Sequence, residues 1–293
     1  MIKTEQEIYD AAIKIAKNDE RIRGVYVHGS YANPNIVKDK YSDYDIVFVV
    51  TEIDSLVDNN DWLNDFGDIS FVFEGHRNEN IFFGKEINDL SRFYFWGLLF
   101  KDGSQIDLLA EIKEEAMQSK FTANKRTIVL LDKDNCLPTM PCYENPIIDK
   151  PTEDKYTACC GGFWWFLSDV VKAIARDQLP YAMEKYNFLI RPTLNKMIDW
   201  HIEIKTDFST TGEDNGRHYK KHLSEDFYSL YMKTYSDCGY ENFWNAIFTA
   251  CELFSKVAPE VGDYFGFAYN KQNETTMMAY LTKIKESMQK ERM

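Results

Sequence analysis

The sequence lacks the long apolar runs of a membrane protein. Its longest strongly apolar run, "FYFWGLLF" (93–100), is far too short to cross a bilayer. The opening residues, "MIKTEQEIYDAAIKIAK", are charged and amphipathic and contain no apolar stretch of the kind that a signal peptide needs. We therefore expect a soluble, cytoplasmic protein with no membrane partner.

Cysteine pairs are also lacking. The six cysteines stand at positions 136, 142, 159, 160, 238 and 251, and no two of them form a CxxC pair. A chain of 293 residues can bury a core without disulfides, so we expect reduced thiols that only pack. His218 and His222 share the spacing of zinc ligands on one helix face, but no third ligand stands at a useful distance in the sequence. A surface pair is the simpler interpretation.

Basic residues are outnumbered. The chain has 34 Lys and Arg against 47 Asp and Glu, which gives a net charge of −13. This balance argues against nucleic acid as a partner, because nucleic-acid binding depends on Lys and Arg that neutralise phosphates. It suits a cationic small molecule attracted by the field of the whole protein, and it equally describes an ordinary acidic protein.

The two halves of the chain differ in pattern. In the first half, helical patterns near 4–18 and 54–65 alternate with short runs rich in Val, Ile, Phe and Tyr, which predict strands. The predicted strands are "GVYVHG", "YDIVFVV", "DISFVFEG", "FYFWGLLF" and "SQIDLLAEI". In the second half the patterns are helical, near 153–176, 179–204, 219–235, 240–257 and 273–290. Pro192 should kink or divide the second of these helices.

Four of the eight prolines, at 138, 141, 146 and 151, lie between the two halves and are typical of a linker. We therefore predict an α+β protein with three parts. Residues 1–136 form a domain with a mixed β-sheet and flanking helices, 137–152 form a Pro-rich linker, and 153–293 form an α-helical bundle.

The stretch "YVHGSYANPNIVKDKYSDYDIVFVV" (26–50) carries the clearest chemical signal. Asp43 and Asp45 stand two residues apart on a predicted strand, so their side chains project to the same face. Two carboxylates this close cannot both stay ionised cheaply unless a cation lies between them. Mg²⁺ typically binds one or two carboxylates together with phosphate oxygens. The pair therefore predicts a magnesium site.

Two further features extend this site. Gly29 and Ser30 follow a predicted strand and precede what we expect to be a helix start, where backbone N–H groups can hold a phosphate. Asp107 stands among apolar neighbours on another predicted strand, where an unpartnered acid would be costly. If the two strands are neighbours, Asp107 either completes the metal site or accepts a proton from an attacking hydroxyl. The set predicts a site for a metal-bound nucleoside triphosphate.

Three similar signals do not carry this chemistry. Asp132-Lys133-Asp134 repeats the D-x-D spacing but follows the apolar "TIVLL", so it predicts a polar turn. Asp65-Phe66-Gly67 spells the metal-binding triplet of kinases, but the Gly-rich loop and the preceding H-R-D of a kinase are lacking. Gly84-Lys85-Glu86 lacks the Ser or Thr of a phosphate-binding loop.

The Gly-Ser turn, the D-x-D strand and the third strand carboxylate together resemble the nucleotidyltransferase superfamily. The likeness narrows to the aminoglycoside 6-adenylyltransferases, which modify streptomycin, and it covers nearly the whole chain with the motifs in order. The matching runs are "GSYANPNIVKDKYSDYDIVFVV", "WLNDFG", "DGSQIDL", "LLDKDN", "FWW", "VVKAIARDQ", "IRPTLNKMIDW", "SEDFY", "TYSDCGYENFWNAIF" and "ELFSKVAPEV".

This resemblance implies transfer of AMP from ATP, as co-substrate, to a hydroxyl of a streptomycin-like aminoglycoside, with release of pyrophosphate and antibiotic resistance as the result. By position, Asp43 and Asp45 would bind Mg²⁺. Asp107 would be the third carboxylate at the metal and the general base. Gly29 and Ser30 would hold the phosphates.

In the second half, "GRHYK" (216–220) matches a basic segment of the family, so Arg217 and Lys220 are candidates for binding the triphosphate, unless they only begin a solvated helix. Trp164, Trp165 and Asp169 are candidates for binding the sugar rings, although a Trp pair in a helix is also typical of a core.

The chain departs from the family pattern at three places. Gly161-Gly162 replaces an acidic position before the Phe-Trp pair, His28 stands where Glu is frequent, and Asn270 replaces a proline. The resemblance is therefore weaker for the acceptor than for the chemistry. Two alternatives stay open: adenylyl transfer to another small hydroxylated metabolite or a protein side chain, and a catalytically idle nucleotide-binding protein.

Overall fold

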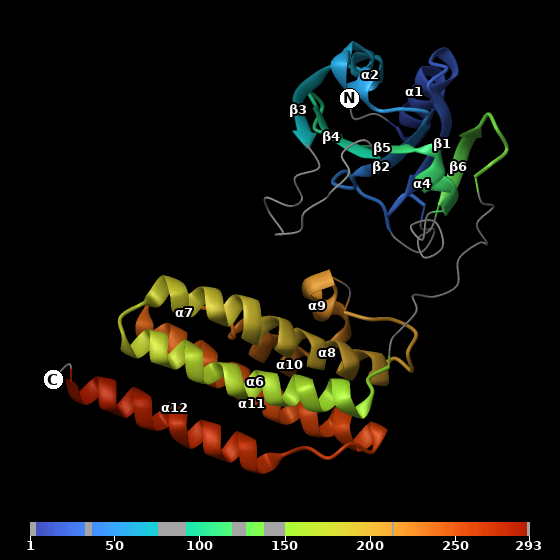
Figure 1. Cartoon of the computed structure of the whole chain (residues 1–293). Coiled ribbons are helices and arrows are strands. Elements are labelled where there is room, and N and C mark those ends of the chain that lie inside the picture. Colours follow the sequence, from blue (N-terminus) through green and yellow to red (C-terminus); the bar gives the residue numbers. More distant parts are fainter. Residues whose placement is uncertain are drawn as a thin grey trace. The chain divides into compact units, whose positions relative to one another are not determined.

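The computed structural model describes residues 4–32, 37–75, 92–118, 127–137, 150–212 and 214–291. The chain divides into two compact units, 1–143 and 144–293, and each is described by itself (Figure 1). The predicted linker 137–152 falls mostly on 138–149, which lie outside the described residues. The predicted domain boundaries therefore stay a prediction.

The N-terminal unit is built on a six-stranded sheet with the order β3-β4-β5-β2-β1-β6 (Figure 1). Its strands are β1 (Ile22–His28), β2 (Tyr44–Val50), β3 (Ile69–Gly75), β4 (Phe93–Phe100), β5 (Gln105–Ile112) and β6 (Ile128–Asp132). The neighbours β2 and β5 are parallel, and every other neighbouring pair is antiparallel. The predicted mixed sheet and all five predicted strands are thus confirmed.

One face of the sheet is covered by helices. These are α1 (Glu5–Asn18), α2 (Asp54–Asp58) and the 3-10 helix η1 (Asp61–Phe66). Helix α1 begins with a capping box, in which the Thr4 hydroxyl accepts a hydrogen bond from the Glu7 N–H and the Glu7 carboxylate accepts one from the Thr4 N–H. Alternate side chains of β2, including Tyr44, Ile46 and Phe48, are buried in this layer. The helix predicted over 54–65 is therefore two short helices.

The opposite face has a much smaller apolar cluster. Tyr26, Val47, Val49 and Ala116 are buried there, and the last of these belongs to helix α4 (Lys113–Gln118), which continues directly from β5. This helix was not predicted. It packs on β5 and β2 near the ends of these strands, away from Asp45 and Asp107. The polar side chains of the sheet lie on this second face.

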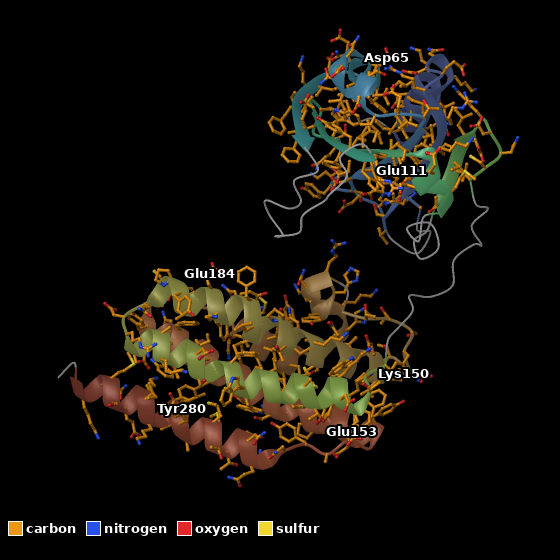
Figure 2. The ribbon with its side chains drawn as sticks, in the orientation of Figure 1. Asp65, Glu111, Lys150, Glu153, Glu184 and Tyr280 are labelled. Carbon is orange, nitrogen blue, oxygen red and sulfur yellow. The ribbon has the colours of Figure 1, made fainter. Side chains whose placement is uncertain are left out.

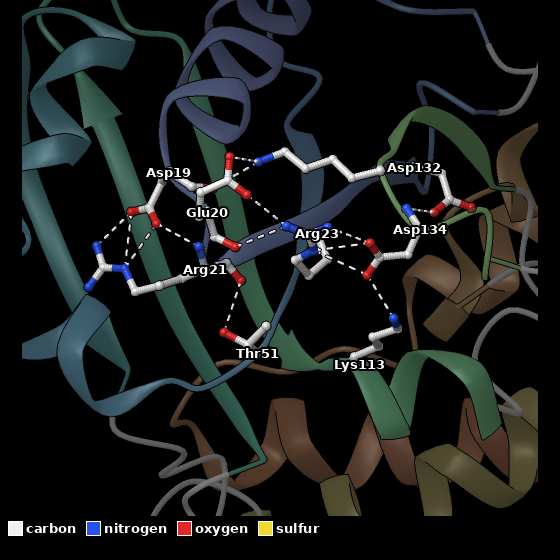
Figure 3. Close-up of polar contacts among 9 residues, drawn as sticks. Asp19, Glu20, Arg21, Arg23, Thr51, Lys113, Asp132 and Asp134 are labelled. Carbon is white, nitrogen blue, oxygen red and sulfur yellow. Dashed lines mark hydrogen bonds and ion pairs between the residues drawn. The ribbon is translucent and has the colours of Figure 1, made fainter.

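Strand β6 was also not predicted, because "TIVLL" was interpreted only as an apolar run before a turn. It forms an edge of the sheet by antiparallel pairing with β1. In the turn that follows, the Asp132 carboxylate accepts hydrogen bonds from three backbone N–H groups. Asp134 pairs with Arg23 and with Lys113, and these partners lower the pKa of Asp134 (Figure 3). This D-x-D is the structural polar turn that the sequence predicted.

The second unit is helical. Its elements are α6 (Glu153–Ala175), α7 (Leu179–Lys185), the π-helix η2 (Tyr186–Ile190), α8 (Arg191–Lys205), η3 (Asp214–Gly216), α9 (Tyr219–His222), α10 (Glu225–Met232), α11 (Tyr240–Phe265) and α12 (Lys271–Glu291). In the core, the rings of Phe163 and Phe254 stack with their centroids 3.9 Å apart. The predicted α+β architecture, with a sheet domain followed by a helical bundle, is confirmed.

The helices of this unit differ from the predicted ones near Pro192, Pro259 and Ser224. The π-helix η2 separates α7 from α8 and ends at Ile190, two residues before Pro192, so the predicted helix is divided close to this proline, as expected. Pro259 lies inside α11, which continues to Phe265, so the predicted end at 257 was wrong. The single helix predicted over 219–235 was also wrong. Ser224 caps a new helix there, because its hydroxyl accepts the Phe227 N–H.

Within the described part of the chain, α6 is the one helix long and apolar enough to cross a membrane by length and composition. It packs against α7, α8, α11 and α12, and this burial accounts for its apolar side chains. The five cysteines in the described ranges are free thiols, as expected, and Cys142 lies outside those ranges.

Candidate active site

The parallel pairing of β2 with β5 places two of the predicted carboxylates side by side. The register sets Asp45 opposite Asp107, so both side chains project from the same face of the sheet. On the other side of β2, the antiparallel partner of Asp45 is His28, the last residue of β1. Asp43 directly precedes β2 and is exposed. The topology therefore places Asp45 beside Asp107, with Asp43 at the start of β2, and the roles of these three residues stay a prediction.

Gly29 forms the back of this site. Its φ of 71° lies in the left-handed region, and a Cβ atom added to it would lie 1.9 Å from Oδ2 of Asp45. The Asp45 carboxylate thus lies directly against the backbone of the Gly29-Ser30 turn, and only glycine leaves room for it. The turn and the D-x-D strand form one packed unit.

The predicted helix start after Ser30 is wrong for the residues that can be described. Residues 29–32 form a turn, and 33–36 lie outside the described ranges. An anion held here would be bound by the N–H groups of the turn and would gain nothing from a helix dipole over 29–32.

Both Asp107 and Asp43 are harder to ionise than ordinary aspartates. Burial raises the pKa of Asp107, and a hydrogen bond from Nε2 of Gln105 to Oδ1, at 3.5 Å, lowers it in part. Asp43 is exposed overall, but partial burial of its carboxylate raises the pKa, and the negative charge of Asp107 raises it further. A divalent cation at this edge would relieve the cost of both charges.

The carboxylates of Asp43, Asp45 and Asp107 are ligands of the kind that Mg²⁺ binds. Among the described residues, no three His, Cys, Asp or Glu side chains are gathered closely enough to form a ready metal cage. Mg²⁺ does not require such a cage, since it commonly takes one or two carboxylates and completes its shell with water and phosphate oxygens. Asp45 and Asp107, which are paired in the register, could supply the one or two carboxylates that such an ion takes.

The sequence did not single out Glu111. It lies four residues after Asp107, on the same face of β5, and is 1% exposed (Figure 2). The Tyr26 hydroxyl donates a hydrogen bond of 2.6 Å to its Oε1, and burial raises the pKa of Glu111. The even spacing of the two acids in "DLLAEI" could have revealed it. Glu111 and Tyr26 form a buried polar contact on the same face of the sheet as Asp107, four residues further along β5.

A cavity of about 150 Å³ lies beside Asp43. Its walls come from the loop before β2, including Lys40 and Tyr41, and from the turn between β4 and β5, including Gly103 and Ser104. The sequence gave no signal for this cavity, because it is formed by two loops that are distant in the chain.

In the helical unit, Arg217 and Lys220 are exposed, and neither side chain pairs with a carboxylate in the described ranges. Tyr219 between them is buried, and its hydroxyl donates hydrogen bonds of 2.9 Å to the Asn195 carbonyl and to Oδ1 of Asp199. The buried tyrosine anchors the segment while both cations face solvent. This geometry is compatible with phosphate binding, which stays a prediction.

The tryptophan pair is divided between two environments. Trp164 is 3% exposed, and its Nε1 donates a hydrogen bond to the Tyr269 hydroxyl at 3.1 Å. The prediction that Trp164 binds substrate is therefore corrected: it is a core residue. Trp165 is 69% exposed, and Asp169, one helical turn later, forms an ion pair with Lys172 at 2.9 Å. Only Trp165 and Asp169 stay candidates for contact with an acceptor.

Comparison with known proteins gives concordant results. A family model described as streptomycin adenylyltransferase matches residues 2–284. The chain is 33% identical to the aminoglycoside 6-adenylyltransferase of Bacillus subtilis (strain 168), over 93% of this chain and 95% of that protein. It is 31% identical to the protein of the same name from Campylobacter jejuni, over 93% of each. A crystal structure of an aminoglycoside 6-adenyltransferase from Bacillus subtilis matches with 30% identity, covering 97% of this chain and 99% of that one, with a TM-score of 0.46.

Proposed function

Because the chain belongs to the streptomycin adenylyltransferase family, we propose that it transfers AMP from ATP to a hydroxyl of a streptomycin-like aminoglycoside and thereby confers resistance in the cytoplasm. The observation that carries this proposal is the register of β2 and β5, which pairs Asp45 with Asp107 beside the Gly29 turn. The net charge of −13 also favours a cationic acceptor.

In the proposed reaction, the oxygen of an acceptor hydroxyl attacks the α-phosphorus of ATP. The bond from that phosphorus to the oxygen bridging to the β-phosphate breaks, and pyrophosphate leaves. Asp107 accepts the proton of the attacking hydroxyl as the general base. When bound by Asp43 and Asp45, Mg²⁺ would neutralise charge on the phosphates.

The remaining residues position the substrates. The N–H groups of Gly29 and Ser30 would hold phosphate oxygens next to the Asp45 carboxylate, which lies against the Gly29 backbone. Arg217 and Lys220 are candidates for binding the triphosphate, and Trp165 and Asp169 are candidates for contact with the acceptor. Catalysis then consists mainly of orientation and charge neutralisation.

Pyrophosphate release from ATP and Mg²⁺, with and without streptomycin, tests the proposal. The wild-type protein should release pyrophosphate only when streptomycin is present. Asp45→Asn should lower kcat by about 10²- to 10³-fold, because it removes a charge that contacts the phosphate and metal site. Asp65→Asn is the matched control, since Asp65 is an exposed aspartate of the same unit, in η1 (Figure 2). Equal activities of the two variants would contradict the metal assignment.

The second candidate function is the same adenylyl transfer to an acceptor other than streptomycin, and one observation favours it. Gly161, Trp165 and Asp169 follow one another at intervals of four along α6, and a Cβ at Gly161 would meet nothing within 4 Å. The place where the family resemblance leads us to expect an acid is therefore empty space beside the exposed Trp165.

A panel of hydroxylated acceptors with labelled ATP separates the candidates. Transfer to another compound but not to streptomycin would select the second. ATP binding without transfer to any acceptor would indicate an idle nucleotide-binding protein.

A further inference from the structure

The polar face of the sheet carries exposed apolar side chains beyond Asp107. On β3 and β4, Phe71 is 58% exposed, Phe73 45% and Leu99 39%, and Phe95 is half-buried. We refer to Phe71, Phe73, Phe95 and Leu99 as the apolar strip. Exposed phenylalanines near the edge of a sheet promote aggregation unless they bind something. The exposure of the strip makes it a candidate binding surface.

The registers place this strip in line with the carboxylates. Asp45 pairs with Asp107, Asp107 pairs with Gly97, and Gly97 pairs with Phe73. These four residues form one row across four neighbouring strands, with their side-chain positions on the same face. Two strand spacings separate Asp107 from Phe73, which is about 10 Å. One row thus joins the proposed catalytic base to an exposed aromatic ring.

Gly97 leaves the middle of this row without a side chain. A Cβ there would meet Cβ of Phe73 at 3.3 Å and Cε1 of Phe95 at 3.5 Å, so the two aromatic residues flank the glycine. Their ring centroids are 6.3 Å apart and the rings are inclined by 62°. Gly97, the neighbour of Asp107 in the register, is thus bordered by two aromatic side chains.

The direction of the reaction indicates what occupies the apolar strip. In phosphoryl-type transfer, the attacking and leaving oxygens lie roughly in line on opposite sides of the phosphorus. The Gly29-Ser30 turn lies at the end of β1, on one side of Asp45, and β4 and β3 lie on the other side, beyond Asp107. If the turn holds the departing phosphates, the acceptor hydroxyl approaches from the side of the strip.

We propose that the apolar strip is the acceptor platform: a ring of the aminoglycoside lies against the exposed Phe73 and its neighbour Phe95 while its hydroxyl reaches Asp107. This inference rests on the proposed adenylyl transfer. A sugar ring presents an apolar C–H face to an aromatic surface, and cationic substituents are attracted to aromatic faces. The carboxylates of Asp43 and Asp107 at the other end of the platform complement the positive charge of such an acceptor.

Steady-state kinetics of Phe73 variants test the platform. Phe73→Ala should raise KM for streptomycin by about three- to tenfold, the range expected for loss of an aromatic contact, and leave KM for ATP unchanged. Phe73→Trp retains an aromatic face and should restore most of the affinity. Val129→Ala is the control, because Val129 is 41% exposed on β6, at the opposite edge of the same sheet. Phe73 is half exposed, so its truncation should leave the thermal midpoint nearly unchanged.

Each outcome decides the inference. Unchanged KM for streptomycin in Phe73→Ala overturns the platform while transfer by the wild-type protein upholds the proposed function. A raised KM for ATP alone would assign the strip to the nucleotide base, and a lowered thermal midpoint with unchanged KM would assign it to packing. Both of these results overturn the platform. A wild-type protein that transfers AMP to no aminoglycoside overturns the proposed function and the platform together.

Discussion

Replacing Gly29 by alanine is the most direct test of how the turn and the metal site are coupled. The substitution adds one methyl group at a position where the Cβ would lie 1.9 Å from Oδ2 of Asp45. Real Cβ atoms do not approach other heavy atoms within 3.0 Å, so either the carboxylate or the turn must move by about 1 Å. The substitution is therefore small, and its main contact is with the Asp45 carboxylate.

Two separate costs follow from the geometry. The left-handed φ of 71° costs an alanine about 1–2 kcal/mol, which lowers the free energy of unfolding. A displacement of about 1 Å at a catalytic group can cost on the order of 10²-fold in rate. We expect Gly29→Ala to lower kcat/KM for adenylyl transfer by about 10²-fold, a larger effect than its loss of stability can explain.

Gly266→Ala provides the matched control. Gly266 ends α11 with a φ of 77°, close to that of Gly29, but an added Cβ would meet nothing within 4 Å. It carries the same backbone cost without the clash, so it should lower stability similarly and leave kcat/KM unchanged. Pyrophosphate release measures the activity, and urea unfolding measures the stability. If the two variants have equal activity, the Asp45 carboxylate does not depend on the bare backbone at Gly29.

Two further predictions concern buried acids. Tyr26→Phe removes the donor to the buried Glu111 carboxylate and should lower the free energy of unfolding by about 1–3 kcal/mol in urea at neutral pH. A loss within about 0.5 kcal/mol, the range of surface substitutions, would contradict it. Asp107→Asn should abolish turnover and, without metal, raise Tm at pH 7. Burial raises the pKa of Asp107 in the folded state above its unfolded value. The stability of the wild-type protein therefore falls as the pH rises from the unfolded pKa through the folded pKa, and the neutral asparagine avoids this loss. The difference in Tm should vanish below the ordinary aspartate pKa, and an equal or lower Tm at pH 7 would refute it.

Local sequence signals predicted the strands well where they were strong. The β-branched and aromatic runs of β2 and β4 match the observed strands residue for residue. Strand β6 was missed because it is short, and it becomes a strand through pairing with β1, which lies about a hundred residues earlier in the chain. The parallel register that joins Asp45 to Asp107 is likewise a long-range feature. From the sequence alone, this adjacency could be predicted only on the condition that the two strands are neighbours in the sheet.

The tryptophan pair shows a signal that was present and not used. The buried side chains of α6 recur at helical spacing, at Cys160, Phe163, Trp164, Leu167 and Val171. This periodicity places Trp164 on the apolar stripe and Trp165 outside it. By contrast, the turn after Ser30 has no helical periodicity of its own, and the helix expected there came only from the Gly-Ser motif.

The parallel pairing of β2 with β5 has a consequence for how the protein becomes active during synthesis. The turn that would hold the phosphates and the first two aspartates emerge from the ribosome early, but the proposed base emerges only with β5, after β3 and β4 have been made. Closing such a long loop is slow compared with forming local hairpins, so the pairing of β5 with β2 should be a late event in folding. A nascent or truncated chain that ends before β5 should therefore have no transferase activity, whatever affinity it has for nucleotide.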